Sequence, residues 1–145
     1  MLKVVIDTNV FVSGLANKNS SCGRILQAWK SGEITLVISF AILDELKRVL
    51  DYPNIKGFFR KAHISDKDIK DLFIAISINA VLEQDVDGPL IIKEDPSDDS
   101  FIHCAVQGNA EYIISGDKHL LKFEEYQGIK IIKPTDFIRI LKQQK

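Results

Sequence analysis

Short apolar runs alternate with helical patterns along this chain, and this alternation constrains the fold most strongly. The helical patterns place apolar residues three or four positions apart, as at Ile42, Leu46 and Leu50. Strands that alternate with helices indicate a parallel sheet covered by helices on both faces. We therefore expect an α/β fold, a three-layer α/β/α sandwich with a mainly parallel central sheet, as a single domain over residues 1–145. The strand-like runs are residues 3–6, 35–38, 80–83, 112–115 and 129–132.

Local signals place several ends of these elements. Ser39 is predicted to cap the helix that follows the second strand, and Ser65 with Asp68 has the spacing of a capping box. A polar loop is expected at residues 16–21. Residues 89–93 are apolar but short, and they fit either an edge strand or an extended loop.

Composition excludes several classes of protein. The 145 residues fit one domain, and 46% apolar residues can build a full core. The net charge of −1 does not indicate a nucleic-acid binder, nor does it exclude one, because a metal ion could neutralise some of the carboxylates. Cys22 and Cys104 form no CxxC pair, which argues against zinc or iron–sulfur sites. The chain begins with a strand rather than a leader and has no apolar run of about 20 residues, so we expect a cytoplasmic protein without a membrane span.

Four acidic residues stand where strands end or on the helices beside them. Asp7 follows the first strand, Glu45 lies in the helix after the second, Asp98 opens a later helix, and Asp117 follows the fourth strand. Ligands bind at the carboxyl ends of strands in open α/β sheets, so these side chains should converge. Crowded carboxylates repel each other unless a cation lies among them, and Mg²⁺ and Mn²⁺ prefer such oxygen ligands. This pattern favours a metal-dependent enzyme of phosphodiester or phosphoryl chemistry.

Each of these acids also has a purely structural interpretation. Asp7 could form a turn or cap a helix, and Asp117 could cap the short turn that follows it. Glu45 lies near the edge of the apolar face of its helix, but it could also be a solvated residue that pairs with Lys47 or Arg48.

The acidic segment at residues 94–99 contains more carboxylates than helix capping requires. The helix macrodipole favours one or two acids at a helix start, and this segment holds four. On a helical wheel Asp98 falls on the same side as Ile102, and Asp99 lies about 100° further round, at the edge. We therefore predict Asp98 as the inward metal ligand, with Asp99 as its neighbour and alternative ligand.

Other chemistries fit the chain less well. No Ser, Cys and His set suggests a nucleophilic triad, and no P-loop motif is present. A receiver-like phosphoacceptor domain would share the parallel sheet and the Lys133-Pro134 pair, but it needs an acceptor Asp after the third strand, and Asp51 lies at a helix end instead. A phosphatase of the haloacid dehalogenase type needs a second Asp where Asn9 stands.

The acidic motifs together resemble those of PIN-domain ribonucleases, in particular the toxins of toxin–antitoxin modules. The similar segments are VVIDTNVFVSG, ELKRVL, DPSDDSFIHCA and YIISGDKHLL, in the same order over nearly the whole chain. The resemblance implies that Asp7, Glu45 and Asp98 correspond to the core acids of that family and Asp117 to its fourth, more variable acid. It also implies that Asn9 and Ser115 are supporting polar residues.

The same resemblance implies a function and partners. It implies an Mg²⁺- or Mn²⁺-dependent endoribonuclease that hydrolyses RNA, forms a homodimer and pairs with a small antitoxin protein. The alternative is a non-catalytic RNA-binding or partner-binding module of the same fold, but such a module would have lost core acids, and none is lost here. Basic residues around the site would contact the RNA backbone. The candidates are Lys18, Arg24, Arg48, Lys56, Arg60, Lys61 and Lys118.

Overall fold

The structure is a computed structural model that describes residues 1–85 and 99–144. Within these residues six strands form one sheet in the order β3-β2-β1-β4-β6-β5. Neighbouring strands are parallel except β5 and β6, which are antiparallel. The mainly parallel sheet that the sequence predicts is therefore confirmed. The strands are β1 (Leu2–Ile6), β2 (Ile34–Ser39), β3 (Ala80–Glu83), β4 (Tyr112–Ile114), β5 (Glu125–Tyr126) and β6 (Ile129–Ile132).

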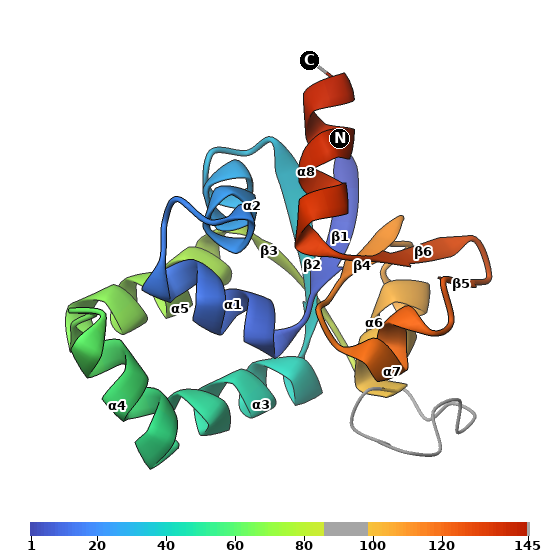
Figure 1. Cartoon of the computed structure of the whole chain (residues 1–145). Helices are drawn as coiled ribbons and strands as arrows, with labels where there is room; N and C mark the ends of the chain where they lie inside the picture. The colour runs from blue at the N-terminus through green and yellow to red at the C-terminus, as the bar shows by residue number, and fades with distance from the viewer. Residues whose placement is uncertain (86–98, 145) are drawn as a thin grey trace.

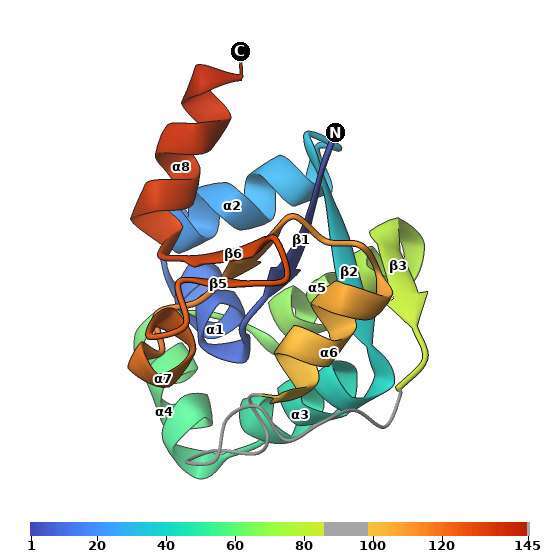
Figure 2. The ribbon, with the colours of Figure 1, turned by 90° about the vertical axis from the view of Figure 1, so that its right-hand side faces the viewer.

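Helices cover both faces of this sheet (Figure 1). Figure 2 shows α6 in front of the sheet and α2 and α5 behind it, so the predicted three layers are confirmed. No helix in the described part of the chain is long and apolar enough to cross a membrane. The helices are α1 (Thr8–Ala16), α2 (Ser21–Lys30), α3 (Phe40–Leu50), α4 (Pro53–Lys61), α5 (Asp66–Asn79), α6 (Asp99–Gln107), α7 (Lys118–Leu121) and α8 (Pro134–Gln143).

The central strands are apolar because both of their faces are buried. Val4 and Val5 in β1, Leu36 in β2 and Ile113 in β4 are fully buried. Edge strand β3 differs, and its Leu82 is 48% exposed. The core therefore lies along β2, β1 and β4.

Several predicted local features are present. The Ser39 hydroxyl accepts a hydrogen bond from the Ile42 amide at 3.2 Å, and Ser65 with Asp68 forms the predicted capping box. Cys104 is buried, and burial raises the pKa of its thiol to about 12, so it stays protonated. Residues 89–93, where the sequence allows an edge strand or a loop, lie outside the described residues.

The strand order creates a switch point between β1 and β4. From β1 the chain passes through α1 and α2 to β2 on one side of β1, and later elements place β4 on the other side. At such a point the connections leave the carboxyl ends of the two strands in opposite directions, and a crevice opens between them. Any ligand site of this sheet is expected there.

One stability prediction follows from the packing of α2 against the segment before it. A Cβ on Gly23 would lie 2.5 Å from the carbonyl oxygen of Lys18 and closer still to that of Asn17. Because these are backbone atoms, Gly23→Ala should lower the free energy of unfolding by about 1–3 kcal/mol. In α4 a Cβ on Gly57 would meet no atom within 4 Å, so Gly57→Ala should raise the free energy of unfolding by about 0.5–1 kcal/mol. Urea denaturation of both variants measures these changes, and shifts of the same sign would show that the contact at Gly23 is misjudged.

Candidate active site

Asp7 lies at the carboxyl end of β1, next to the end of β4. Its amide donates to the Ile114 carbonyl at 3.0 Å, and its side chain is 5% exposed. Although Asp7 is the residue before α1, its carboxylate makes no capping hydrogen bond to that helix. Instead, Oδ2 accepts a hydrogen bond from the Ser115 hydroxyl at 2.7 Å. The carboxylate is therefore directed toward β4, at the switch point of the sheet.

Ser115 connects Asp7 to the turn after β4. Its hydroxyl is fully buried, and it accepts a hydrogen bond from the Asp117 amide at 2.9 Å. The Asp117 carboxylate accepts from the His119 amide at 2.7 Å and so caps α7. Asp117 thus has the predicted capping role, and it remains half-buried beside the same strand end. Capping uses Oδ1, which leaves the second carboxylate oxygen for another contact.

Glu45 reaches the same place from the middle of α3. Its Oε2 accepts a hydrogen bond from the Thr8 hydroxyl at 2.8 Å, and Thr8 is 5% exposed. Neither Lys47 nor Arg48 is within ion-pair distance of Glu45; the ion pairs among the described residues involve other side chains. Of the two alternatives, the half-buried position beside the sheet is the one observed. The sequence pattern did not reveal Thr8, although it directly follows Asp7.

The negative charges of these carboxylates repel one another. Burial raises the pKa of Asp7 above its ordinary value, and the charges of Asp117 and Glu45 raise it further. The hydrogen bond from Ser115 opposes this increase and does not cancel it. Ionised Asp7 is therefore destabilised in the metal-free protein, and a nearby cation would relieve this cost.

Of the two candidate acids of α6, the structure describes one. Asp98 lies outside the described residues, whereas Asp99 begins α6 and is 5% exposed. Asp99 is therefore buried, and the choice between Asp98 and Asp99 as the metal ligand stays a prediction. Helix α6 packs against both the sheet and α3, and Ile102 and Cys104 are buried on its covered side.

The carboxylates suit a divalent cation by their chemistry but do not form a closed cage. Among residues 1–85 and 99–144, no three His, Cys, Asp or Glu side chains lie close enough together to surround an ion by themselves. The oxygen donors of Asp7, Glu45 and Asp117 are those that Mg²⁺ and Mn²⁺ prefer. Mg²⁺ usually keeps several waters and uses one or two carboxylates together with substrate phosphate. An open set of acids therefore fits such an ion.

The remaining predicted residues lie at the surface. Asn9 follows Thr8 in α1 and is exposed, unlike the buried Thr8. Arg48 is exposed one helical turn after Glu45, and Lys118 is exposed directly after Asp117. These two basic side chains stand next to the acids in sequence. The other RNA candidates, also exposed, are Lys18, Arg24, Lys56, Arg60 and Lys61.

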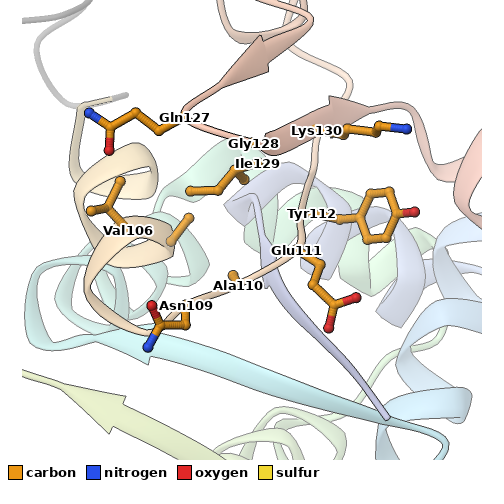
Figure 3. A pocket seen from close by; sticks show the side chains of 10 residues that line it. Val106, Asn109, Ala110, Glu111, Tyr112, Gln127, Gly128, Ile129 and Lys130 are labelled. Atoms are coloured by element: carbon orange, nitrogen blue, oxygen red, sulfur yellow. The ribbon is translucent and has the colours of Figure 1, made fainter.

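A separate pocket of about 480 Å³ lies at the opposite end of the sheet (Figure 3). It is lined by Tyr112, the first residue of β4, and by Ile129, the first residue of β6, so it opens at the amino ends of these strands. Glu111 supplies the single carboxylate among its lining residues. This pocket is therefore separate from the acidic site at the carboxyl ends of the strands.

Comparisons with known proteins agree with this fold. The chain is 29% identical over 145 residues to Uncharacterized protein MJ1680 of Methanocaldococcus jannaschii, covering 94% of this chain and 90% of that protein. The fold of the present chain is similar to that of a chain in the "Crystal structure of VapBC2 from Rickettsia felis bound to a DNA fragment from their promoter". That match has a TM-score of 0.55 and 13% identity, and covers 91% of this chain and 98% of the other. Residues 3–119 match the family model of the PIN domain, so the chain belongs to the PIN domain family.

Proposed function

We propose that this protein is a metal-dependent endoribonuclease that hydrolyses RNA phosphodiester bonds. The observation that carries the proposal is the buried Asp7 carboxylate at the switch point of the sheet, close enough to Glu45 and Asp117 for their charges to raise its pKa. A protein does not keep repelling carboxylates at a buried strand end for stability, because their mutual repulsion is unfavourable. PIN-domain membership supports nuclease chemistry at this position.

In this proposal the acids share the task of holding Mg²⁺ or Mn²⁺. Asp7 and Glu45 supply the ligands from β1 and α3, and Asp117 supplies one from the turn after β4. Asp99 is our choice for the acid of α6, because it is buried, while Asp98 remains the alternative. When bound, the cation would polarise the phosphate and lower the pKa of an attacking water.

Polar and basic side chains around the acids would orient the substrate. Ser115 fixes the Asp7 carboxylate by its 2.7 Å hydrogen bond, and exposed Asn9 lies at the start of α1, where it could contact a nucleotide. Arg48 and Lys118 are exposed next to two of the acids and would neutralise backbone phosphates.

We further propose that the protein is the toxin of a toxin–antitoxin pair. The support is the similarity of its fold to a chain in the structure of VapBC2 bound to promoter DNA. In this role the whole chain, residues 1–145, acts as one nuclease domain, forms a homodimer and binds a small antitoxin protein. It would work in the cytoplasm, where it meets RNA.

Removal of the metal tests the proposal. Purified protein should cleave labelled RNA with Mg²⁺ or Mn²⁺ and stop when EDTA is added. Because the ion would bind only the folded protein, Mn²⁺ at 100 times its dissociation constant should raise the free energy of unfolding by about 2.7 kcal/mol. Cleavage that continues in EDTA would exclude the metal mechanism.

A matched pair of variants in α3 tests the assignment of Glu45. Glu45→Gln keeps the size of the side chain and removes its charge, so the rate of RNA cleavage should fall by at least about 10²-fold. Asp44→Asn removes a charge from the neighbouring exposed residue and should leave the rate close to that of the wild type. If all RNAs remain intact with both metals, the non-catalytic binding module becomes the better interpretation.

A further inference from the structure

Thr8 connects the first strand to the acid of α3. It directly follows Asp7, it is the first residue of α1, and it is 5% exposed. Its hydroxyl lies 2.8 Å from Glu45 Oε2, although the two residues are 37 positions apart in the sequence. An ionised carboxylate only accepts hydrogen bonds, so the hydroxyl is the donor. The position of Glu45 is thus fixed relative to the backbone that carries Asp7.

Among the described residues, this contact leaves one Glu45 oxygen without a hydrogen bond. Oε2 accepts the Thr8 proton, while no hydrogen bond from a described residue reaches Oε1. On the other side of the site, Asp7 Oδ2 accepts from the Ser115 hydroxyl in the same way. Each carboxylate therefore has one oxygen held by a buried hydroxyl group. This arrangement orients the carboxylate and leaves lone pairs for a ligand.

We propose that Thr8 is a positioning residue whose hydroxyl holds Glu45 in the orientation that binds a divalent cation. The inference rests on the proposed function, since it assumes that Glu45 is a ligand. Hydrogen-bond partners of metal ligands typically change metal affinity or activity 10–100-fold when they are removed. Thr8 is buried at the start of α1, where its hydroxyl is shielded from solvent and directed at Glu45.

A purely structural role would have a different signature. In that case the hydroxyl would stabilise the start of α1 and the packing of α1 on α3, and its loss would lower the melting temperature. The affinity for a cation would then stay unchanged. The two roles are separated by measuring metal binding and stability on the same variants.

The test is a titration of the whole protein with Mn²⁺, in which electron paramagnetic resonance reports the free ion. Thr8→Val has nearly the same shape and removes the donor, so its affinity for Mn²⁺ should fall about 10–100-fold while the melting temperature stays close to that of the wild type. Thr8→Ser keeps the hydroxyl and should bind Mn²⁺ nearly as tightly as the wild type. Thr35→Val is the matched control, because the Thr35 hydroxyl contacts the Met1 sulfur near the amino end of β2.

The outcomes separate this inference from the proposed function. If the wild type binds Mn²⁺ but cleaves no RNA, the ribonuclease proposal fails and the Thr8 variants still decide the positioning role. Equal Mn²⁺ affinity in Thr8→Val and the wild type overturns the inference, as does a loss in Thr8→Ser as large as that in Thr8→Val. A wild-type protein that binds no Mn²⁺ overturns it as well.

Discussion

Asp7→Asn should lower the rate of RNA cleavage by at least about 10²-fold while the protein stays folded. The two side chains are nearly isosteric, and an amide oxygen can still accept the hydrogen bond from Ser115. The variant loses the charge that holds the cation, and metal positioning supplies several kcal/mol of transition-state stabilisation. The measurement is the rate of cleavage of a labelled RNA at saturating Mn²⁺.

The same substitution should stabilise the metal-free protein. The folded-state pKa of Asp7 is raised above its unfolded value, so folding takes up a proton, and the stability present at low pH is lost as pH rises through the folded pKa. Asn does not ionise, so the Asp7→Asn protein does not lose this stability as pH rises. Its melting temperature near neutral pH without metal should equal or exceed that of the wild type. As a control, Asp71→Asn on the exposed face of α5 should change neither rate nor stability. A destabilised Asp7→Asn protein would mean that its low activity reflects unfolding rather than lost chemistry.

Asp99→Asn should also lower cleavage by at least about 10²-fold, and Asp98→Asn should have a much smaller effect. Asp99 is 5% exposed at the start of α6, and this helix packs against α3, which carries Glu45. The adjacent acid makes the pair its own control, because both variants remove one charge from the same segment. The cleavage rates of the two variants decide which acid binds the cation. A loss confined to Asp98→Asn would show that Asp98 is the ligand, as the helical wheel predicts.

Most of the fold could be predicted from the sequence because the apolar patterns match the burial. Val4 and Val5 are fully buried, as a continuous apolar run in a parallel strand requires. Helix α1 was not predicted. Its Val10 and Val12 are β-branched, and most of its residues are buried, so it shows neither high helix propensity nor an amphipathic period. Burial between neighbouring elements decides its conformation.

The short strand β5 was missed for a different reason. It has two residues and exists through its antiparallel pairing with β6. The connecting residues Gln127 and Gly128 have φ values of 49° and 85°. Positive φ at both loop positions is typical of a tight hairpin turn, and the Gly128 that permits it is the one signal the sequence offered.

The site could be predicted only in part, because its contacts join distant positions. Placement at a strand end identified Asp7, the family resemblance added Ser115, and the structure joins them by a hydrogen bond across 108 positions. Thr8 could not be found, because its partner Glu45 lies in another helix and a single helix pattern carries no such information. The choice between Asp98 and Asp99 stays a prediction, because only Asp99 lies within the described residues.

The central hypothesis is that the carboxylates around Asp7 hold the catalytic cation. Anomalous X-ray diffraction from crystals grown with Mn²⁺ tests it most directly, because it locates the ion without reference to activity. We expect one anomalous peak beside the carboxylates of Asp7, Glu45, Asp99 and Asp117, with ligand distances of about 2.0–2.6 Å, and no such peak in Asp7→Asn. A peak elsewhere on the protein, or an equal peak in Asp7→Asn, would contradict the hypothesis.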